Sequence, residues 1–284
     1  MHLTLSLNAG FHARAPGFNV MNVAAPTVRN GLVASSLAAE RPFVFGTGPY
    51  HVRMAVSESD RLAAFRLRFL VFNLELNEGL EESYATGHDV DEFDRICDHL
   101  IVEHVITGKI VGTYRLQTGA TALANIGFYS EREFDFSPYR RLGNSVIELG
   151  RACVDRDHRS TDALSLLWRG IAQYAVSRGG RYLIGCSSLT SQDAAHGTAV
   201  YEAMRDHLAA PELRTVPQPA FAMPLMSSEN ASDRIPKLLR AYLAVGAKIC
   251  GPPAIDQEFK TIDFLTLMDL ETLHPRVYRR FMKA

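Results

Sequence analysis

The chain has 284 residues, of which 47% are hydrophobic and 21% are charged, a composition typical of a globular protein with one large domain or two small ones. Its 30 basic residues are offset by 31 acidic ones, so charge gives no reason to expect nucleic acid as a partner. No apolar run approaches the roughly 18 residues of a membrane span, and the scattered cysteines (Cys97, Cys153, Cys186 and Cys250) predict reduced core thiols in a cytoplasmic protein rather than a zinc or redox site.

Residues 1–45 differ in composition from the rest of the chain. They are rich in Ala, Gly, Asn, Val and Ser, and Glu40 is their one acidic residue. The basic start, compact apolar core and cleavage site of a secretory signal are missing. We expect a flexible or loosely packed tail over 1–45 and a single domain over 46–284, with a membrane-surface or partner-binding arm as the alternative for the tail.

The domain begins with a predicted strand and helix. Residues 51–55 alternate like a strand, and Ser57 or Ser59 can cap the helix that follows. Apolar residues recur at helical spacing along this helix: Leu62, Phe65, Phe69, Phe72 and Leu76. Gly79 ends the pattern, and the acidic, irregular residues 80–97 are expected to form a mobile loop that closes over a site.

The rest of the chain alternates strands and helices. Thr107-Gly108 predicts the turn of a hairpin between residues 99–106 and 109–116, and a long connection at 117–143 follows. Strands are predicted at 145–154, 181–186, 249–250 and 261–267, and helices at 162–178, 194–208, 233–245 and near Pro275. This order describes an α/β fold, with a mixed central sheet flanked by helices on both faces.

Two charges interrupt the strand predicted at 145–154. Glu148 and Arg151 lie in a segment that otherwise has the apolar pattern of a buried strand. Burying a charge costs several kcal/mol unless it is paired and hydrogen-bonded. Candidate partners lie upstream: Asp91, Asp94, Asp98 and Arg115. These charges, each beside or within an apolar strand, predict one polar network at one cleft.

The motifs that carry these charges resemble those of the GNAT acyltransferase superfamily. The matching stretches are Arg68-Phe69-Leu70-Val71-Phe72, Asp91-Glu92-Phe93-Asp94, Gly112-Thr113-Tyr114-Arg115, and Glu148-Leu149-Gly150-Arg151 with Cys153-Val154. Their order and spacing are similar to the branch that contains acyl-homoserine-lactone synthases, long-chain N-acyl amino acid synthases and ornithine-lipid N-acyltransferases. The resemblance covers about residues 50 to 270.

Within this branch the chain looks closest to the ornithine-lipid enzymes. The stretches concerned are Cys97-Asp98-His99-Leu100, Leu167-Trp168-Arg169-Gly170-Ile171, Gly185-Cys186-Ser187-Ser188 and Gly251-Pro252-Pro253-Ala254-Ile255-Asp256. The resemblance implies transfer of a 3-hydroxyacyl chain from acyl carrier protein to the α-amine of ornithine, with no permanently bound cofactor. It also implies a splayed strand pair, formed by 145–154 and 181–186, that admits the pantetheine arm of the donor. Another amino acid acceptor or a homoserine-lactone product is the alternative.

The turn after this strand departs from the GNAT pattern. Ordinary GNAT acetyltransferases have a Gly-rich turn there, whose amides cradle the coenzyme A pyrophosphate, whereas this chain has the glycine-free residues 156–163. Bulky side chains oppose such a close approach, which favours acyl carrier protein over acyl-coenzyme A because phosphopantetheine carries a single phosphate. Residues expected to meet that phosphate or an acidic carrier-protein helix are Arg156, Arg159 and Ser160. The other candidates for the donor site are Cys153, Val154 and Arg68. The alternative role of Arg68 is to anchor the loop.

The predicted chemistry is aminolysis of a thioester. An α-ammonium with a pKa near ~8 must lose a proton before it attacks, and a half-buried Glu148 with a raised pKa could accept that proton. A backbone N–H near Ala152 or Cys153 could stabilise the oxyanion if the strand bulges there. Residues expected to organise the site and the acceptor are Arg151, Arg115, Asp91 and Asp94. The alternative is that Glu148 and Arg151 form buried ion pairs that only order the loop.

Several other side chains have two interpretations. The aromatic residues of the long connection, Phe128, Tyr129, Phe134 and Phe136, either cover the core or line a tunnel for the acyl chain. Trp168 is expected in the core. Cys186 is expected in the core rather than as an acyl-enzyme nucleophile with His99 or His196 as its base. No cluster of His, Asp or Glu has the spacing of a metal site.

A different class of function is also open. A degenerate transferase could bind acyl chains or carrier protein without reaction, and the missing Gly-rich turn is its best support. The intact charged positions argue against it, because a decayed site has little reason to bury charge. Because the product would be amphiphilic, peripheral association of the protein with the inner face of the membrane is a further expectation.

Overall fold

The computed structural model describes residues 43–226 and 235–282, so most of the tail predicted at 1–45 and the start of the helix predicted at 233–245 lie outside the described residues. In this part of the chain nine strands form one sheet. The strands are β1 (Val44–Thr47), β2 (Tyr50–Met54), β3 (Asp98–His104), β4 (Lys109–Thr118), β5 (Val146–Val154), β6 (Tyr182–Leu189), β7 (Lys248–Ile249), β8 (Ala254–Asp256) and β9 (Thr261–Asp269). The helices are α1 (Glu58–Arg68), α2 (Ser83–Thr86), α3 (Gly119–Ala124), α4 (Ser137–Arg140), α5 (Thr161–Ser177), α6 (Ala194–Ala203), α7 (Lys237–Ala244) and α8 (Pro275–Met282).

The sheet is mixed, as the sequence predicts. Its order is β1-β2-β3-β4-β5-β6-β9-β7, and β8 pairs with β9. The β5–β6 pair is parallel and the other pairs are antiparallel. The crossover between β5 and β6 contains α5, the helix predicted at 162–178, which is the usual way of joining neighbouring parallel strands. Val44 and Phe45, which the sequence analysis assigned to the tail, belong to β1.

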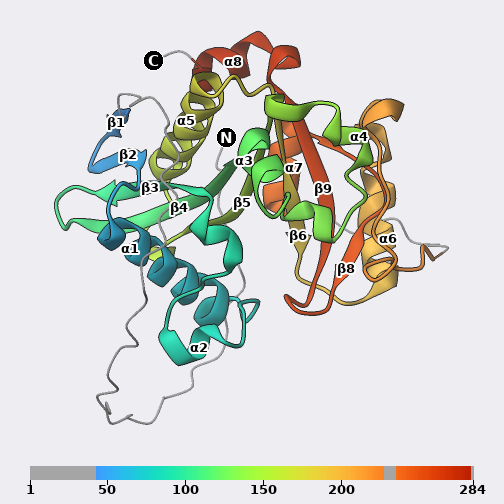
Figure 1. Cartoon of the computed structure of the whole chain (residues 1–284), viewed down its shortest axis with the longest axis horizontal. Helices are drawn as coiled ribbons and strands as arrows, with labels where there is room; N and C mark the ends of the chain where they lie inside the picture. The colour runs from blue at the N-terminus through green and yellow to red at the C-terminus, as the bar shows by residue number, and fades with distance from the viewer. Residues whose placement is uncertain (1–42, 227–234, 283–284) are drawn as a thin grey trace.

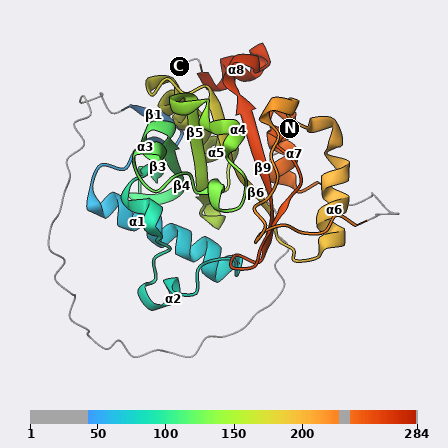
Figure 2. The ribbon, with the colours of Figure 1, turned by 45° about the vertical axis from the view of Figure 1, so that its right-hand side comes forward.

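Helices cover both faces of the sheet (Figures 1 and 2). On one face α1 packs its apolar residues against β3, β4 and β5, and the segment 119–145 packs against β6 and β9. On the other face α5 buries Leu166, Leu167 and Ile171 against β2, β3 and β4, and α6 and α7 cover β9. The helix at the start of the domain begins at Ser57, whose hydroxyl accepts the backbone N–H of Asp60.

The two strands predicted to splay do separate. Their pairing is limited to Val146–Glu148 against Tyr182–Ile184, so β5 and β6 part directly after Glu148. Gly185 is the first β6 residue beyond this pairing, and a Cβ atom there would lie 2.2 Å from the carbonyl oxygen of Leu149. Glycine therefore allows the two strands to stay close up to the point where they diverge.

The long acidic segment predicted as a mobile loop is largely ordered by its own hydrogen bonds. It contains α2 and the short 3₁₀ helix η2 (Glu92–Arg95), whose cap Asp91 accepts the N–H of Phe93. The preceding helix α1 continues as a π-helix, η1 (Phe69–Glu75). π-Helical turns are uncommon and occur frequently at functional sites; here η1 brings Phe72 to the main cavity.

Candidate active site

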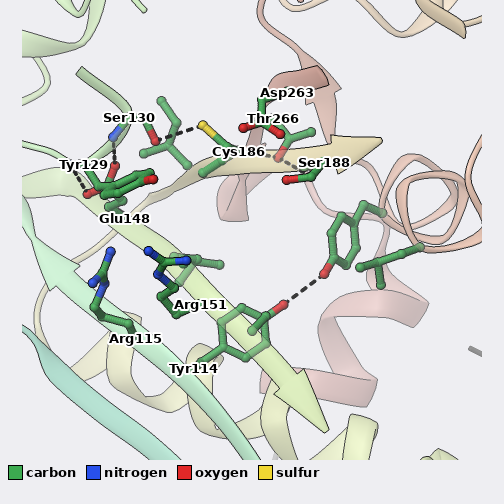
Figure 3. Close-up of a pocket in the computed structure, with 18 of the residues that line it drawn as sticks. Tyr114, Arg115, Tyr129, Ser130, Glu148, Arg151, Cys186, Ser188, Asp263 and Thr266 are labelled. Carbon is green, nitrogen blue, oxygen red and sulfur yellow. Dashed lines mark hydrogen bonds between the residues drawn. The ribbon is translucent and has the colours of Figure 1, made fainter. Parts of the chain in front are cut away.

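A cavity of about 540 Å³ opens where β5 and β6 part. Its polar wall contains Glu148, Arg151, Cys186 and Asp263, and its apolar wall contains Phe72, Leu76, Leu149, Trp168, Leu183, Leu238 and Met268. Trp168 therefore borders the cavity as well as the core, in contact with Tyr242, whose hydroxyl is hydrogen-bonded to that of Tyr114 at 2.9 Å (Figure 3). The combination of a long apolar wall with a few convergent polar groups is typical of a small-molecule site.

Glu148 is the last residue of β5 that pairs with β6. Its side chain is buried, and its two carboxylate oxygens accept the backbone N–H groups of Tyr129 and Ser130, each at 2.8 Å (Figure 3). Burial raises the pKa of this carboxyl, and the two N–H donors oppose the rise. The residue thus both borders the cavity and orders residues 129–130. Its carboxylate can serve as a base and as a structural acceptor at once, because a carboxylate has about four acceptor positions and these bonds use two.

Strand β5 has the β-bulge on which a role for the backbone N–H near Ala152 or Cys153 depends. Thr113 and Arg115 of β4 pair with Cys153 and Gly150 of β5, so β5 has one extra residue between these pairs. Arg151 lies in the bulge with φ of +48°, a left-handed conformation that is strained for an arginine. Since Gly150, Arg151 and Ala152 all border the cavity, the bulge turns this part of the backbone and the Arg151 side chain toward it.

Arg151 is the most loosely held of the buried arginines at the site. Its Nη2 lies 3.4 Å from Asp91 Oδ2, and its Nε lies 3.8 Å from Asp89 Oδ1 without a hydrogen bond. The guanidinium also lies 4.4 Å from the ring centre of Phe259. Burial favours the neutral form, but the nearby carboxylates, Asp89 first, raise the pKa of Arg151 above its usual value. The side chain therefore remains a cation with a donor left for a ligand.

Behind Arg151 the predicted charged residues come together in one network. Arg68 donates to both oxygens of Asp94, at 2.7 and 2.9 Å, and to Asp89 at 2.6 Å. Arg115 donates to Asp91 at 2.6 Å and more weakly to Asp94 at 3.4 Å. Burial acts to raise the pKa of Asp94, but Arg68, Arg115 and the Asp91 N–H together outweigh it and hold that pKa well below the usual range. The charges of Arg68, Arg115 and Arg151 thus balance those of Asp89, Asp91 and Asp94.

Asp89 is a member of this network that the sequence analysis missed. Its side chain is fully buried against Arg68. The signal was weak, because Asp89 stands in an acidic, irregular segment where exposed carboxylates are common. Asp98, by contrast, was a candidate partner but lies apart from the network, where it accepts a hydrogen bond from Tyr174 at 2.8 Å.

Most of the residues predicted for the donor site are buried or bonded to other residues of the protein. Arg68 is buried in the aspartate network and does not border the cavity, which fits its alternative role of anchoring the loop. Arg159 forms a two-pronged ion pair with Glu75 at 2.6 and 2.7 Å, and the Ser160 hydroxyl caps α5. Two other candidates, Cys153 and Val154, are buried in β5, whereas Arg156 is exposed on the turn.

The aromatic residues of the long connection divide between the two predicted roles. Tyr129 borders the cavity, between Arg115 and Arg151. The other three, Phe128, Phe134 and Phe136, lie in the core cluster beneath β6 and β9 and do not border the cavity. The tunnel interpretation therefore does not fit these three phenylalanines, because their rings pack against each other and against Tyr139.

Cys186 lies beside a second acidic group that the sequence analysis did not predict. Its thiol donates to Ser130 Oγ at 3.5 Å and to Glu133 Oε2 at 3.7 Å. Ligand atoms of Glu133, Cys186 and Asp263 lie within 4.8 Å of one another. Burial, reinforced by Glu133 and Asp263, raises the pKa of Cys186 well above its usual value, which disfavours a thiolate nucleophile. His99, one proposed base, instead contacts Asp94, and burial lowers its pKa to about 4.

The split parallel pair, the bulge and the cavity between them define an acyltransferase of the GNAT class. A family model for the acetyltransferase (GNAT) domain matches residues 67–169. The L-ornithine N(alpha)-acyltransferase of Agrobacterium fabrum is 33% identical over 259 residues, which cover 85% of this chain and 88% of that protein. The corresponding enzyme of Brucella abortus is 34% identical over 248 residues, covering 81% of this chain and 87% of that protein. The chain belongs to the L-ornithine N(alpha)-acyltransferase family.

The resemblance inferred from the sequence motifs is therefore confirmed at the level of family and fold. Among solved structures, the acyl-homoserine-lactone synthase LasI aligns with a TM-score of 0.47 and 12% identity, covering 82% of this chain and 94% of that one. In the described residues, no helix is both long enough and apolar enough to cross a membrane.

Proposed function

We propose that this protein transfers a long-chain 3-hydroxyacyl group from the thioester of acyl carrier protein to the α-amine of ornithine. The observation that carries the proposal is the position of Glu148, buried at the point where β5 and β6 part and open to the cavity. The names of the relatives support ornithine as the acceptor. The product would be a lyso-ornithine lipid.

In this proposal Glu148 is the general base. It accepts a proton from the α-ammonium, directly or through a water molecule, and the free amine attacks the thioester carbonyl carbon. The oxyanion that forms accepts a hydrogen bond from a backbone N–H of the bulge around Ala152. The C–S bond then breaks and the proton held by Glu148 passes to the leaving sulfur. The attacking nitrogen loses its second proton to solvent, and the neutral amide and a pantetheine thiol are released.

The acceptor carboxylate is assigned to Arg151. This guanidinium borders the cavity, and its one hydrogen bond within the described residues is the long contact of Nη2 with Asp91 at 3.4 Å. Arginine binds a carboxylate through two parallel N–H donors, which fixes the orientation of the amino acid as well as its position. The aspartate network then has a positioning role, because Asp91 and Asp89 are the carboxylates that lie next to the Arg151 guanidinium.

The acyl donor is proposed to enter through the split between β5 and β6. The pantetheine arm would lie along the bulge, and the acyl chain against the apolar wall formed by Leu183, Trp168 and Met268. Acyl carrier protein is favoured over acyl-coenzyme A because the turn at 156–163 has no glycine to admit a pyrophosphate. Arg156 is the exposed cation on this turn that an acidic carrier-protein helix could meet.

The experiment that tests this function uses the purified chain with 3-hydroxypalmitoyl carrier protein and ornithine. Free thiol release and mass spectrometry of the product would be measured together, with palmitoyl-coenzyme A as the alternative donor. Formation of Nα-hydroxyacyl-ornithine supports the proposal. A different N-acyl amino acid as product would show that the reaction is correct and that the acceptor is not ornithine. Binding of the acyl donor without formation of any amide would favour the non-catalytic binding module.

A further inference from the structure

A second acidic cluster borders the cavity and, unlike the aspartate network, has no arginine or lysine paired with it in the described residues. It consists of Asp263 on β9 and Glu133 in the segment 119–145, with the Cys186 thiol beside them. Both carboxyl groups are almost completely buried, at 4% and 2% exposure. In the part of the chain that the structure describes, neither has an ion pair with an arginine or lysine, whereas each aspartate of the network has one.

The two carboxyl groups are close enough to share one proton. Burial raises the pKa of Glu133 well above its usual range, and the charge of Asp263 adds to this rise. Burial also raises the pKa of Asp263, to about 6. Both shifts favour a state in which the pair holds one proton and one negative charge, as is expected when two carboxyl groups occupy one low-dielectric site.

Asp263 also has an atom left for a ligand. It borders the cavity, and its Oδ1 is buried without a hydrogen-bond partner. Figure 3 shows Asp263 on the same side of the cavity as Cys186, across from Arg151. An unsatisfied oxygen on a buried, charged carboxylate costs free energy unless a donor fills the site. A cationic donor would satisfy the oxygen and balance the charge at once.

We infer that Asp263, supported by Glu133, binds the side-chain ammonium of the amino acid acceptor and so selects a diamino acid. This inference rests on the proposed function and adds the residues that determine acceptor specificity. Hydrogen bonds connect the two ends of the site. The Ser130 N–H donates to Glu148, and the Cys186 thiol lies within hydrogen-bond distance of both Ser130 Oγ and Glu133 Oε2. The α-amine at Glu148 and the side-chain ammonium at Asp263 would therefore lie along one wall.

A divalent metal ion is the competing occupant, and the ammonium fits the cluster better. The three groups are one thiol and two carboxyls, and the raised pKa values of Cys186 and Glu133 favour the protonated form of both. Metal ligands must be deprotonated, so a metal would have to displace both protons. An ammonium needs only hydrogen-bond acceptors and one negative charge.

The test compares ornithine with norvaline, which has the same carbon skeleton without the side-chain amine. In the wild-type protein kcat/KM for ornithine should exceed that for norvaline by at least about a hundredfold, because a site built for a polar group strongly rejects an analogue that lacks it. Asp263→Asn should reduce this ratio at least about tenfold, chiefly through KM for ornithine, while norvaline changes little. Asp269→Asn, the same change at the other end of β9, should leave the ratio unchanged.

Three results would overturn the inference: equal use of norvaline by the wild-type protein, an equal loss with both amino acids in Asp263→Asn, or loss of activity on treatment with a chelator. If no amino acid is acylated at all, calorimetric binding of ornithine and norvaline separates the two proposals. Preferential binding of ornithine that Asp263→Asn removes would keep the inference while the proposed function fails. Equal binding of both amino acids would reject the inference.

Discussion

Arg68 and Asp94 form a two-pronged ion pair in which both side chains are only 1% exposed. Arg68 ends α1 and Asp94 lies in η2, so the pair joins the first helix to the acidic segment. Arg115 binds the same segment from β4 through Asp91. This arrangement gives the segment a fixed position behind Arg151, in line with the alternative role of Arg68 as an anchor of the loop.

Removing Arg68 should therefore destabilise the fold. Arg68→Met would leave Asp94 and Asp89 buried without their main cation, and breaking a buried pair in this way typically costs roughly 3–5 kcal/mol. Urea or thermal unfolding measures the change. Arg205→Met, at an exposed pair with Glu202, is the matched control and should change the free energy of unfolding by less than about 1 kcal/mol. Similar losses in both variants would contradict this role of Arg68.

Glu148→Gln should lower turnover at least about tenfold, since the amide cannot accept the ammonium proton. The amide would also place donors against the N–H groups of Tyr129 or Ser130, so some loss of stability is expected too. The pH dependence of kcat/KM separates the two effects. A general base gives an ascending acid limb that the variant lacks, whereas a purely structural residue leaves the shape of the profile unchanged.

Arg151→Ala should raise KM for ornithine at least about tenfold, because a charge-assisted bond to a carboxylate contributes roughly 1.5–3 kcal/mol. Steady-state kinetics with ornithine and with putrescine, which has no carboxylate, would check the assignment. Putrescine should be a poor acceptor for the wild-type protein and should change little in the variant. A loss of kcat alone, at constant KM, would place Arg151 in a different role.

Gly185→Ala should disturb the split between β5 and β6. The new Cβ would lie 2.2 Å from the Leu149 carbonyl oxygen, so the strands must move apart where the cavity begins. We expect a lower melting temperature and reduced activity. Gly150→Ala is the comparison, because its Cβ would have no neighbour within 4 Å and its stability should be preserved. Wild-type stability in Gly185→Ala would show that the strands tolerate the separation.

Asp263 should make stability depend on pH. Its pKa is raised to about 6 in the folded protein by burial, above the value near ~3.9 of an unfolded chain. The native state therefore holds this proton more tightly, and the free energy of unfolding falls as the pH rises through this window. Asp263→Asn removes that loss, so it should raise the melting temperature at about pH 7.5 and much less at about pH 4.5. An equal shift at both pH values would exclude titration of Asp263 as the cause.

The sequence by itself determined the order of elements and the chemistry available to the site. Apolar periodicity predicted α1 and α5, because amphipathic spacing reflects which face each element buries, and the Thr107-Gly108 turn predicted the hairpin of β3 and β4. The charges of Glu148 and Arg151 indicated the strand that borders the cavity, because a charge in an otherwise apolar strand needs a partner. The short strands β1 and β8 were missed, because they have too few residues to show a period.

Only the tertiary structure decided which groups meet. Glu133 and Asp263 are 130 positions apart, and nothing local to either residue indicates that packing of the segment 119–145 on β9 brings them together. The tertiary structure likewise decided that Arg159 binds Glu75 and that three phenylalanines belong to the core. The physical reason is that periodicity depends on the buried face of one element, whereas a site depends on how several elements pack against each other.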